Sequence, residues 1–347
     1  MNVLIVKLSA LGDVIHTLPS LAALRRGCPD AHITWVVEEG AADMLLDHPY
    51  IDRVLVSGRK RWVADLRRGS NRGKTLSEIR SFVASLRDRR YGVAIDFHGL
   101  FKSALIMGLV RADRKIGYRS MQEMSRFFYN ETIPEDMNKH AVLRYLDFVE
   151  YLGYQAGDPE FTLPTGSVET DRVSGLLEEA GIGRADPFIA VNPVALWKTK
   201  LWGDENFARL ADRIVRDIQM PVVYTGSAAD AAGYIKRIRA FMKESSVDLA
   251  GRTGLRELAD LYRRAALVVS TDSGPMHLAA AMGTPTVALF GPTDPARTGP
   301  FGKGHSVIRS GIECSPCFQK RCESMACMTG ITVDDVFEAV KKRLSAR

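Results

Sequence analysis

Two short apolar runs in the second half of the chain each end in a polar loop, one at T-D-S-G (271–274) and one at G-P-T-D (291–294). Because the carboxyl ends of parallel strands meet at one edge of a sheet, we expect both loops at a ligand-binding edge. A predicted helix follows the first loop, and its unpaired N–H groups and positive end favour a phosphate or diphosphate. The candidate residues for binding such a ligand are Asp272, Ser273, Gly274, His277 and Thr293, of which the Asp272 carboxylate would accept hydrogen bonds from sugar hydroxyl groups. The alternative is an ordinary strand–loop–helix capped by Ser or Asp, with His277 in the core.

A third polar loop follows the apolar run at 188–192 and holds Lys198, Lys200 and two tryptophans. A flexible ammonium group at a sheet edge suits a diphosphate. The alternative is a pair of surface lysines beside packed tryptophan rings. The residue types are compatible with both a diphosphate-binding lysine and a surface lysine.

A carboxylate, Asp13, stands where the first predicted strand (2–8) meets the first predicted helix (14–26). At this position it can accept a proton from a bound hydroxyl group. The alternative is a helix N-cap, which is among the commonest roles of Asp. A helix N-terminus also lowers the pKa of a carboxyl group and so weakens it as a base.

Basic residues are concentrated in the first half of the chain. Residues 59–90 hold eleven Lys and Arg against three acids, a local charge of +8 in a chain of net charge +6. Such a region favours an anionic partner, such as a phosphorylated or carboxylated acceptor. The candidate acceptor-binding residues are Lys7, Lys60, Arg61, Lys102 and Arg144, and the alternative for each is a solvated surface position. Nucleic acid is not expected, because the region has few aromatic side chains for base stacking.

Four cysteines lie close together in the sequence, at Cys314, Cys317, Cys322 and Cys327. Four thiols at this density could bind structural zinc or an iron–sulfur cluster, although only the first spacing is C-x-x-C. Unligated thiols in a structured loop are the alternative. The N-terminal apolar run is short and is interrupted by Asp13, so we expect a first strand, not a signal peptide, and a cytoplasmic protein without disulfides.

Apolar runs alternate with helical patterns through both halves of the 347-residue chain. This alternation predicts an α/β protein with two parallel sheets, each covered by helices on both faces. The Pro- and Gly-rich segment 158–168 is the expected boundary. We therefore expect one domain at 1–160, a second at 168–330, and a C-terminal helix within 331–347.

Several segments together resemble one known family. S-T-D-S-G-P-M-H-L-A-A-A (270–281) and A-L-F-G-P-T-D-P (288–295) are similar to the donor-site signature of the lipopolysaccharide heptosyltransferases, and L-S-A-L-G-D-V-I-H-T-L-P (8–19) is similar to their N-terminal motif. The resemblance implies the two-domain GT-B type, with two Rossmann-like domains facing across a cleft. It further implies an acceptor-binding N-terminal domain, an ADP-heptose-binding C-terminal domain and a last helix that crosses back to the first domain.

The family's activity is inverting transfer of heptose, which needs no metal or cofactor. By resemblance, Asp13 is the general base, and Lys200 in K-L-W holds the donor diphosphate. W-V-V-E-E-G (35–40) and G-L-F-K-S-A (99–104) are most similar to heptosyltransferase I, whose acceptor is the Kdo of the lipid A inner core, so a loose attachment to the inner face of the inner membrane is expected. The cysteine segment departs from that enzyme. It leaves open heptosyltransferase II, a related transferase with another acceptor or sugar, and a non-catalytic nucleotide-sugar-binding regulator with a metal-bound cysteine loop.

Overall fold

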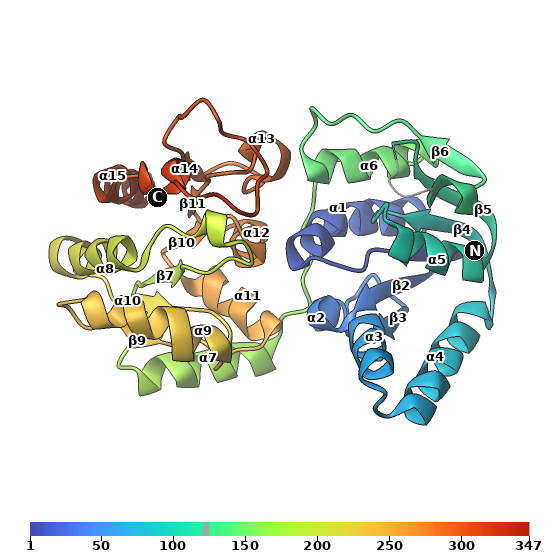
Figure 1. The fold of residues 1–347 in the computed structure, drawn as a ribbon, viewed down its shortest axis with the longest axis horizontal. Helices are drawn as coiled ribbons and strands as arrows, with labels where there is room; N and C mark the ends of the chain where they lie inside the picture. The colour runs from blue at the N-terminus through green and yellow to red at the C-terminus, as the bar shows by residue number, and fades with distance from the viewer. Residues whose placement is uncertain (121–124, 347) are drawn as a thin grey trace. The chain divides into compact units, whose positions relative to one another are not determined.

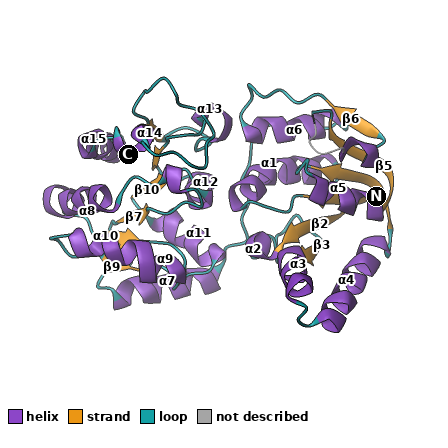
Figure 2. Cartoon of the chain, viewed as in Figure 1, coloured by secondary structure: helices purple, strands orange, loops and turns teal. Residues whose placement is uncertain are grey.

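The chain forms two compact units, Met1–Pro164 and Thr165–Arg347. The structure is a computed structural model and describes residues 1–120 and 125–346. The division between the units lies inside the Pro- and Gly-rich segment 158–168. Figure 1 traces the chain through the two units, and Figure 2 shows the strands of each unit flanked by helices.

The first unit is built on a parallel six-stranded sheet of order β3-β2-β1-β4-β5-β6. Its strands are β1 (Asn2–Val6), β2 (His32–Glu38), β3 (Arg53–Ser57), β4 (Arg90–Asp96), β5 (Arg111–Tyr118) and β6 (Glu131–Ile133). The central strands β1, β2 and β4 are almost entirely buried, as expected of strands that are covered on both faces. The last strand, β6, is short and polar at its start, and the apolar pattern alone does not predict it.

Helices cover both faces of this sheet. They are α1 (Leu11–Gly27), α2 (Glu39–Ala42), α3 (Arg59–Arg68), α4 (Arg72–Arg87), α5 (Phe101–Leu109) and α6 (Ala141–Tyr151), with a short 3-10 turn η1 (Ser125–Phe128). Alternate residues of β1, among them Leu4 and Val6, join a core with Leu86 of α4 and Met107 of α5. On the other face α1 packs against α6.

The second unit repeats this plan with the strand order β12-β11-β10-β7-β8-β9, again all parallel. Its strands are β7 (Ile189–Asn192), β8 (Val222–Tyr224), β9 (Val247–Asp248), β10 (Leu267–Thr271), β11 (Thr286–Leu289) and β12 (Ser306–Ile308). The helical segments are α7 (Ser167–Glu179), η2 (Lys198–Lys200), α8 (Asp204–Arg213), η3 (Ile214–Ile218), α9 (Ala228–Asp230), η4 (Ala231–Ile235), α10 (Lys236–Phe241), α11 (Leu255–Arg264), α12 (Gly274–Ala281), α13 (Pro295–Thr298), α14 (Ala326–Thr329) and α15 (Val333–Ser345).

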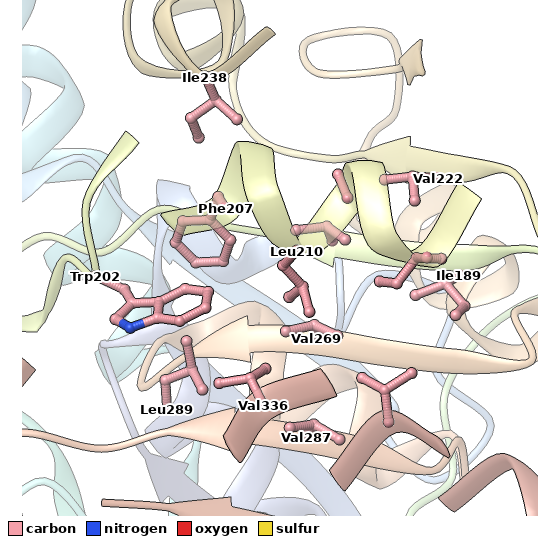
Figure 3. Packing of buried hydrophobic residues seen from close by; sticks show 14 of the residues in the cluster. Ile189, Trp202, Phe207, Leu210, Val222, Ile238, Val269, Val287, Leu289 and Val336 are labelled. Carbon is pink, nitrogen blue, oxygen red and sulfur yellow. The ribbon is translucent and has the colours of Figure 1, made fainter. Parts of the chain in front are cut away.

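A core of the second unit lies between this sheet and α8, α10 and α15. Alternate strand residues such as Val269 and Leu289 face it, and Trp202 packs edge-on against Phe207 with ring centroids 5.1 Å apart. Figure 3 shows these rings beside Leu289 and Val336. The Trp202 indole N–H donates to the Ile331 carbonyl at 2.8 Å, so the loop that follows β7 is tied to the core.

The C-terminal helix α15 packs on α8 and on β10, β11 and β12, all within the second unit (Figure 1). Its buried residues Val336, Phe337 and Val340 belong to the core of that unit. The apolar stripe of the helix is thus used on its own sheet, and the expectation that residues 331–347 cross back to the first domain stays a prediction. Among the described residues, no helix is both long and apolar enough to span a membrane.

Candidate active site

The strand order of the first unit reverses between β1 and β4, since the chain adds β2 and β3 on one side and β5 and β6 on the other. Loops at such a switch point form a crevice at the carboxyl ends of the strands. The loop after β1 leads to Asp13, and the loop after β4 leads to His98 and Lys102. The predicted base and one predicted acceptor-binding lysine therefore lie in the helices that follow two adjacent strands.

The Asp13 carboxylate is half-buried in the first turn of α1, which begins at Leu11. Its Oδ2 accepts the Ala10 N–H at 3.0 Å, so Asp13 closes the helix end as the alternative interpretation expected. The Tyr145 hydroxyl of α6 also hydrogen-bonds the Asp13 side chain. Burial, followed by the Asp13 charge, raises the pKa of Tyr145, so the phenol stays protonated. These contacts fix the carboxylate without removing it from solvent.

Lys7 lies behind this carboxylate and not on the surface. It is 3% exposed, and its ammonium donates to the Phe97 carbonyl at 2.7 Å and to the Tyr145 hydroxyl at 2.6 Å. Burial lowers the pKa of Lys7, and the charges of Asp13 and Asp96 oppose that shift. The side chain is enclosed because β1 is central in the sheet, and the acceptor-binding role of Lys7 stays a prediction.

Arg144 is also enclosed. It is 7% exposed and pairs with Glu135 through a short contact from one guanidinium nitrogen. The Tyr118 hydroxyl donates to the Arg144 carbonyl at 2.6 Å. Arg144 thus forms an ion pair within the first unit, and its acceptor-binding role stays a prediction.

Glu38, at the end of β2, forms ion pairs with several nearby cations. It was not among the residues predicted from the sequence. Arg59 donates to Glu38 Oε1 at 2.8 and 2.9 Å, and Lys60 and Lys102 stand 3.3 and 3.6 Å from its oxygens. Lys102 also donates to the Ser9 hydroxyl at 2.9 Å, beside the Asp13 loop. Burial alone would raise the pKa of Glu38, but the hydrogen bond from Arg59 and the three positive charges outweigh it and lower the pKa.

Arg61 points to a different set of acids. Its guanidinium pairs with Glu78 at 2.7 Å and with Glu39 at 3.2 Å, and Glu78 also accepts the Trp62 indole N–H at 2.8 Å. Arg61 therefore ties α3 to α4 and is separated from Lys60 and Lys102, with which the sequence grouped it. Helical periodicity places residues 60 and 61 about 100° apart around a helix, and this explains the separation.

His98 is a further residue of this crevice that the sequence analysis did not select. Its loop is held by the buried Asp96 carboxylate, which accepts the backbone N–H groups of His98 at 2.7 Å and Gly99 at 3.2 Å. Burial, then the charges of Lys7 and Lys102, lower the pKa of His98 to about 3. The imidazole is therefore neutral at physiological pH. The motif D-F-H-G (96–99) was the available signal, but nothing local showed that the ring lies beside the Asp13 loop.

In the second unit the strand order reverses between β7 and β10. Three neighbouring strands, β7, β10 and β11, send their loops to this switch point. These loops carry Lys200, Asp272 and Thr293. The sequence analysis expected this convergence of polar loops at one sheet edge.

The Asp272 carboxylate is 5% exposed and holds the other two side chains together. Lys200 Nζ lies 2.5 Å from Asp272 Oδ2, and the Thr293 hydroxyl donates to the same oxygen at 2.5 Å. The Lys200 ammonium also stands 4.6 Å from the centroid of the Trp197 ring. Asp272 thus fixes the direction of Lys200, while Lys198 is exposed and belongs to no ion pair in the described residues.

The N-terminus of α12 stands at the same edge. Ser273 caps the helix without a side-chain hydrogen bond to the backbone, and its hydroxyl lies 3.4 Å from that of Ser270. Pro275 is in the first turn and Gly283 follows the last turn with φ of +73°. His277 is 8% exposed on the inner side of the first turn. A helix start with a serine hydroxyl that does not cap its own helix, beside a fixed lysine, is suited to a phosphate.

The four clustered cysteines are free thiols, of which Cys314 and Cys322 are exposed and Cys327 is buried. Within residues 1–120 and 125–346, no group of three or more His, Cys, Asp or Glu side chains is arranged to hold a metal ion. The structure thus gives the zinc or iron–sulfur interpretation of Cys314, Cys317, Cys322 and Cys327 no geometric support.

Two parallel-sheet units, each with polar loops at its switch point, with a carboxylate in one and a cation at a helix start in the other, are typical of a GT-B glycosyltransferase. The sequence profile of glycosyltransferase family 9 (heptosyltransferase) matches residues 79–327. The chain belongs to this family, and the expected fold class and resemblance are confirmed.

Individual relatives agree with this assignment. The chain is 34% identical to lipopolysaccharide heptosyltransferase 1 of Pseudomonas aeruginosa over 93% of its own length and 87% of that protein. It is 30% identical to lipopolysaccharide heptosyltransferase 1 of Escherichia coli K12, over 90% of the chain and 95% of that protein. The solved structure of E. coli heptosyltransferase WaaC with ADP superposes with a TM-score of 0.79 at 26% identity, covering 99% of this chain and 100% of that one.

Proposed function

We propose that the protein is a heptosyltransferase I, which transfers heptose from ADP-heptose to the Kdo of a lipid A inner-core acceptor. The observation that carries the proposal is the Lys200–Asp272–Thr293 arrangement at the start of α12, a site built for a diphosphate. The relatives named heptosyltransferase 1 and the solved complex of E. coli heptosyltransferase WaaC with ADP support this choice of donor. The first unit would take the acceptor and the second unit the donor.

In the proposed reaction Asp13 accepts the proton of an acceptor hydroxyl. The oxygen of that hydroxyl attacks the anomeric carbon of the donor sugar as the bond to the diphosphate breaks, which inverts the configuration. The Ala10 N–H and the Tyr145 hydroxyl hold the carboxylate in position for the transfer. A positioned general base contributes about 10²- to 10⁴-fold to a rate.

The departing ADP carries the negative charge that develops in this step. Lys200, the Ser273 hydroxyl and the N–H groups that begin α12 are placed to stabilise it. Fixed donors of this kind stabilise developing charge because they need no reorientation during the reaction. We therefore propose that leaving-group departure requires no metal ion.

The acceptor would meet the cations around Glu38. Arg59, Lys60 and Lys102 together carry three positive charges against one carboxylate, and Lys60 is 72% exposed. An excess of positive charge beside Asp13 suits the carboxylate of a Kdo residue or a phosphate of lipid A. We retain Lys60 and Lys102 as proposed acceptor-binding residues on this ground.

The acceptor is a lipid, so we also propose that the enzyme works in the cytoplasm at the inner face of the inner membrane. The exposed basic residues of α3 and α4 would hold it there by charge. Binding to vesicles that contain anionic lipid should fall as salt is raised. Salt-independent binding would contradict this mode of attachment.

The proposal is tested by measuring ADP release from ADP-heptose with and without a Kdo-lipid A acceptor, at low and high chelator. Acceptor-dependent release that is insensitive to chelator is the expected result. Release only with a heptosylated acceptor would assign heptosyltransferase II instead. ADP binding without release on any acceptor would favour a non-catalytic nucleotide-sugar-binding regulator.

A further inference from the structure

The cysteine loop, which we define as residues 312–327, lies against the loop that follows β11. The Ser315 hydroxyl donates to the Gly291 carbonyl at 2.6 Å, and the backbone N–H groups of Cys317 and Phe318 donate to the Pro292 carbonyl at 3.0 and 2.7 Å. Three hydrogen bonds thus fasten the cysteine loop immediately next to Thr293. The loop is therefore part of the wall of the donor site.

A fourth hydrogen bond joins the cysteine loop to the opposite side of this site. The Thr199 hydroxyl, beside Lys200 in η2, donates to the Gln319 carbonyl at 2.9 Å, across 120 residues of sequence. Thr199 is 2% exposed, so this bond is shielded from water. The hydrogen bonds to Pro292 and from Thr199 hold the backbone of the cysteine loop up to Gln319. The backbone of the next residue, Lys320, is therefore held in position.

The Lys320 ammonium stands 5.1 Å from the centroid of the Trp197 ring, and the Lys200 ammonium stands 4.6 Å from the same centroid. Two ammonium groups thus share one indole ring. Lys200 has Asp272 as its counter-ion, whereas Lys320 forms no ion pair with any acid in the described part of the chain. Two like charges near one ring repel each other, and an anion that contacts both would relieve that repulsion.

We propose that Lys320 is a second cation for the diphosphate of the nucleotide donor, supplied by the cysteine loop. This inference rests on the proposed function, because it names a further binding residue of the same donor site. Lys200 and Lys320 approach the site from two separate segments, and a diphosphate offers two phosphate groups to them. The cysteine loop then has a part in donor binding that requires no metal.

The test is isothermal titration calorimetry of ADP and of AMP with the full-length protein and its variants. Lys320→Gln should weaken ADP binding about 5- to 20-fold, with a smaller loss for AMP, because one charge-assisted contact to a diphosphate is removed. The dependence of ADP affinity on salt should also become shallower. Lys320→Arg keeps the charge and should retain most of the affinity.

Arg321→Gln is the matched control. Arg321 is the next residue of the same loop, is exposed, and has no ion pair or ring contact in the described residues. Unchanged ADP affinity in Lys320→Gln, or an equal loss of affinity in Arg321→Gln, overturns the inference. In either case, ADP binding by the native protein leaves the proposed function standing. Failure of the native protein to bind ADP would remove the donor site itself, and the inference with it.

Discussion

Replacing Tyr145 by Phe removes a single hydroxyl group from the centre of the first unit. That hydroxyl accepts from Lys7 at 2.6 Å and hydrogen-bonds the Asp13 side chain. An ammonium group has no acceptor, so Lys7 must donate, and the phenol proton is left for the carboxylate. Tyr145 therefore connects a buried positive charge to the proposed base.

The expected loss in rate follows from this connection. A hydrogen bond to a charged group contributes about 1.5–3 kcal/mol, so loss of the bond that orients Asp13 should lower kcat about 10- to 100-fold. Removing a donor to a carboxylate also disfavours its ionised form, so the acid limb of the pH–rate profile should move to higher pH. The free energy of unfolding should fall by about 1–3 kcal/mol, because the buried Lys7 ammonium loses one acceptor.

Steady-state ADP release at several pH values, together with thermal unfolding, measures both effects. Tyr118→Phe is the matched control, because Tyr118 is another buried phenol whose hydroxyl donates to the Arg144 carbonyl at 2.6 Å and has no hydrogen bond to Asp13. It should lose similar stability and keep its kcat. If Tyr145→Phe loses only stability, as the control does, the proposed role in orienting the base is refuted.

Three further predictions concern single side chains of the two units. Asp13→Asn should keep ADP affinity by calorimetry and lose about 10²- to 10⁴-fold in kcat, and turnover near the native rate would exclude it as the base. Lys200→Gln should weaken ADP binding about 10-fold or more, because a charge-assisted contact is lost, and native affinity would place the diphosphate elsewhere. The pKa of Glu38 lies below its usual value of about 4.5, so its ion pairs stabilise the fold above that pH and are lost as the pH falls through the folded pKa. Glu38→Gln should therefore lower the free energy of unfolding by about 1–3 kcal/mol at pH 7. The difference in unfolding free energy between the variant and the native protein should shrink below pH 4.5. A difference that persists in acid would be inconsistent with this ion-pair assignment.

The local pattern of the sequence predicts the elements that carry the sites. The runs that became β1, β10 and β11 are mostly apolar, because central parallel strands are buried on both faces. The polar loops after them place Asp13 and Asp272 at helix starts, as the pattern indicates. Short strands at the sheet edges, β6 and β12, were not predicted, because three residues with polar neighbours carry no periodic signal.

The partners of charged side chains could not be predicted in this way. Lys7 was grouped with surface cations, yet its partner Tyr145 is 138 residues away in the sequence. Lys60 and Lys102 were correctly placed in one region, but the carboxylate that gathers them, Glu38, was not recognised. Their contacts depend on which strands are neighbours, and that order is a property of the sheet.

The sequence by itself determined the class of fold, the family, and the short motifs that carry the candidate site residues. Apolar periodicity and the succession of strand, loop and helix are encoded over a few neighbouring residues, and they can therefore be recognised without the structure. Only the tertiary structure decided that Lys7 and Arg144 are enclosed, that α15 completes the core of the second unit, and that the cysteine loop reaches Trp197 with Lys320. These outcomes depend on contacts between distant segments. The sequence specifies such contacts only through the packing of the whole unit. Burying a charged side chain is unfavourable unless it is paired, and its possible partners are set by how the whole unit packs.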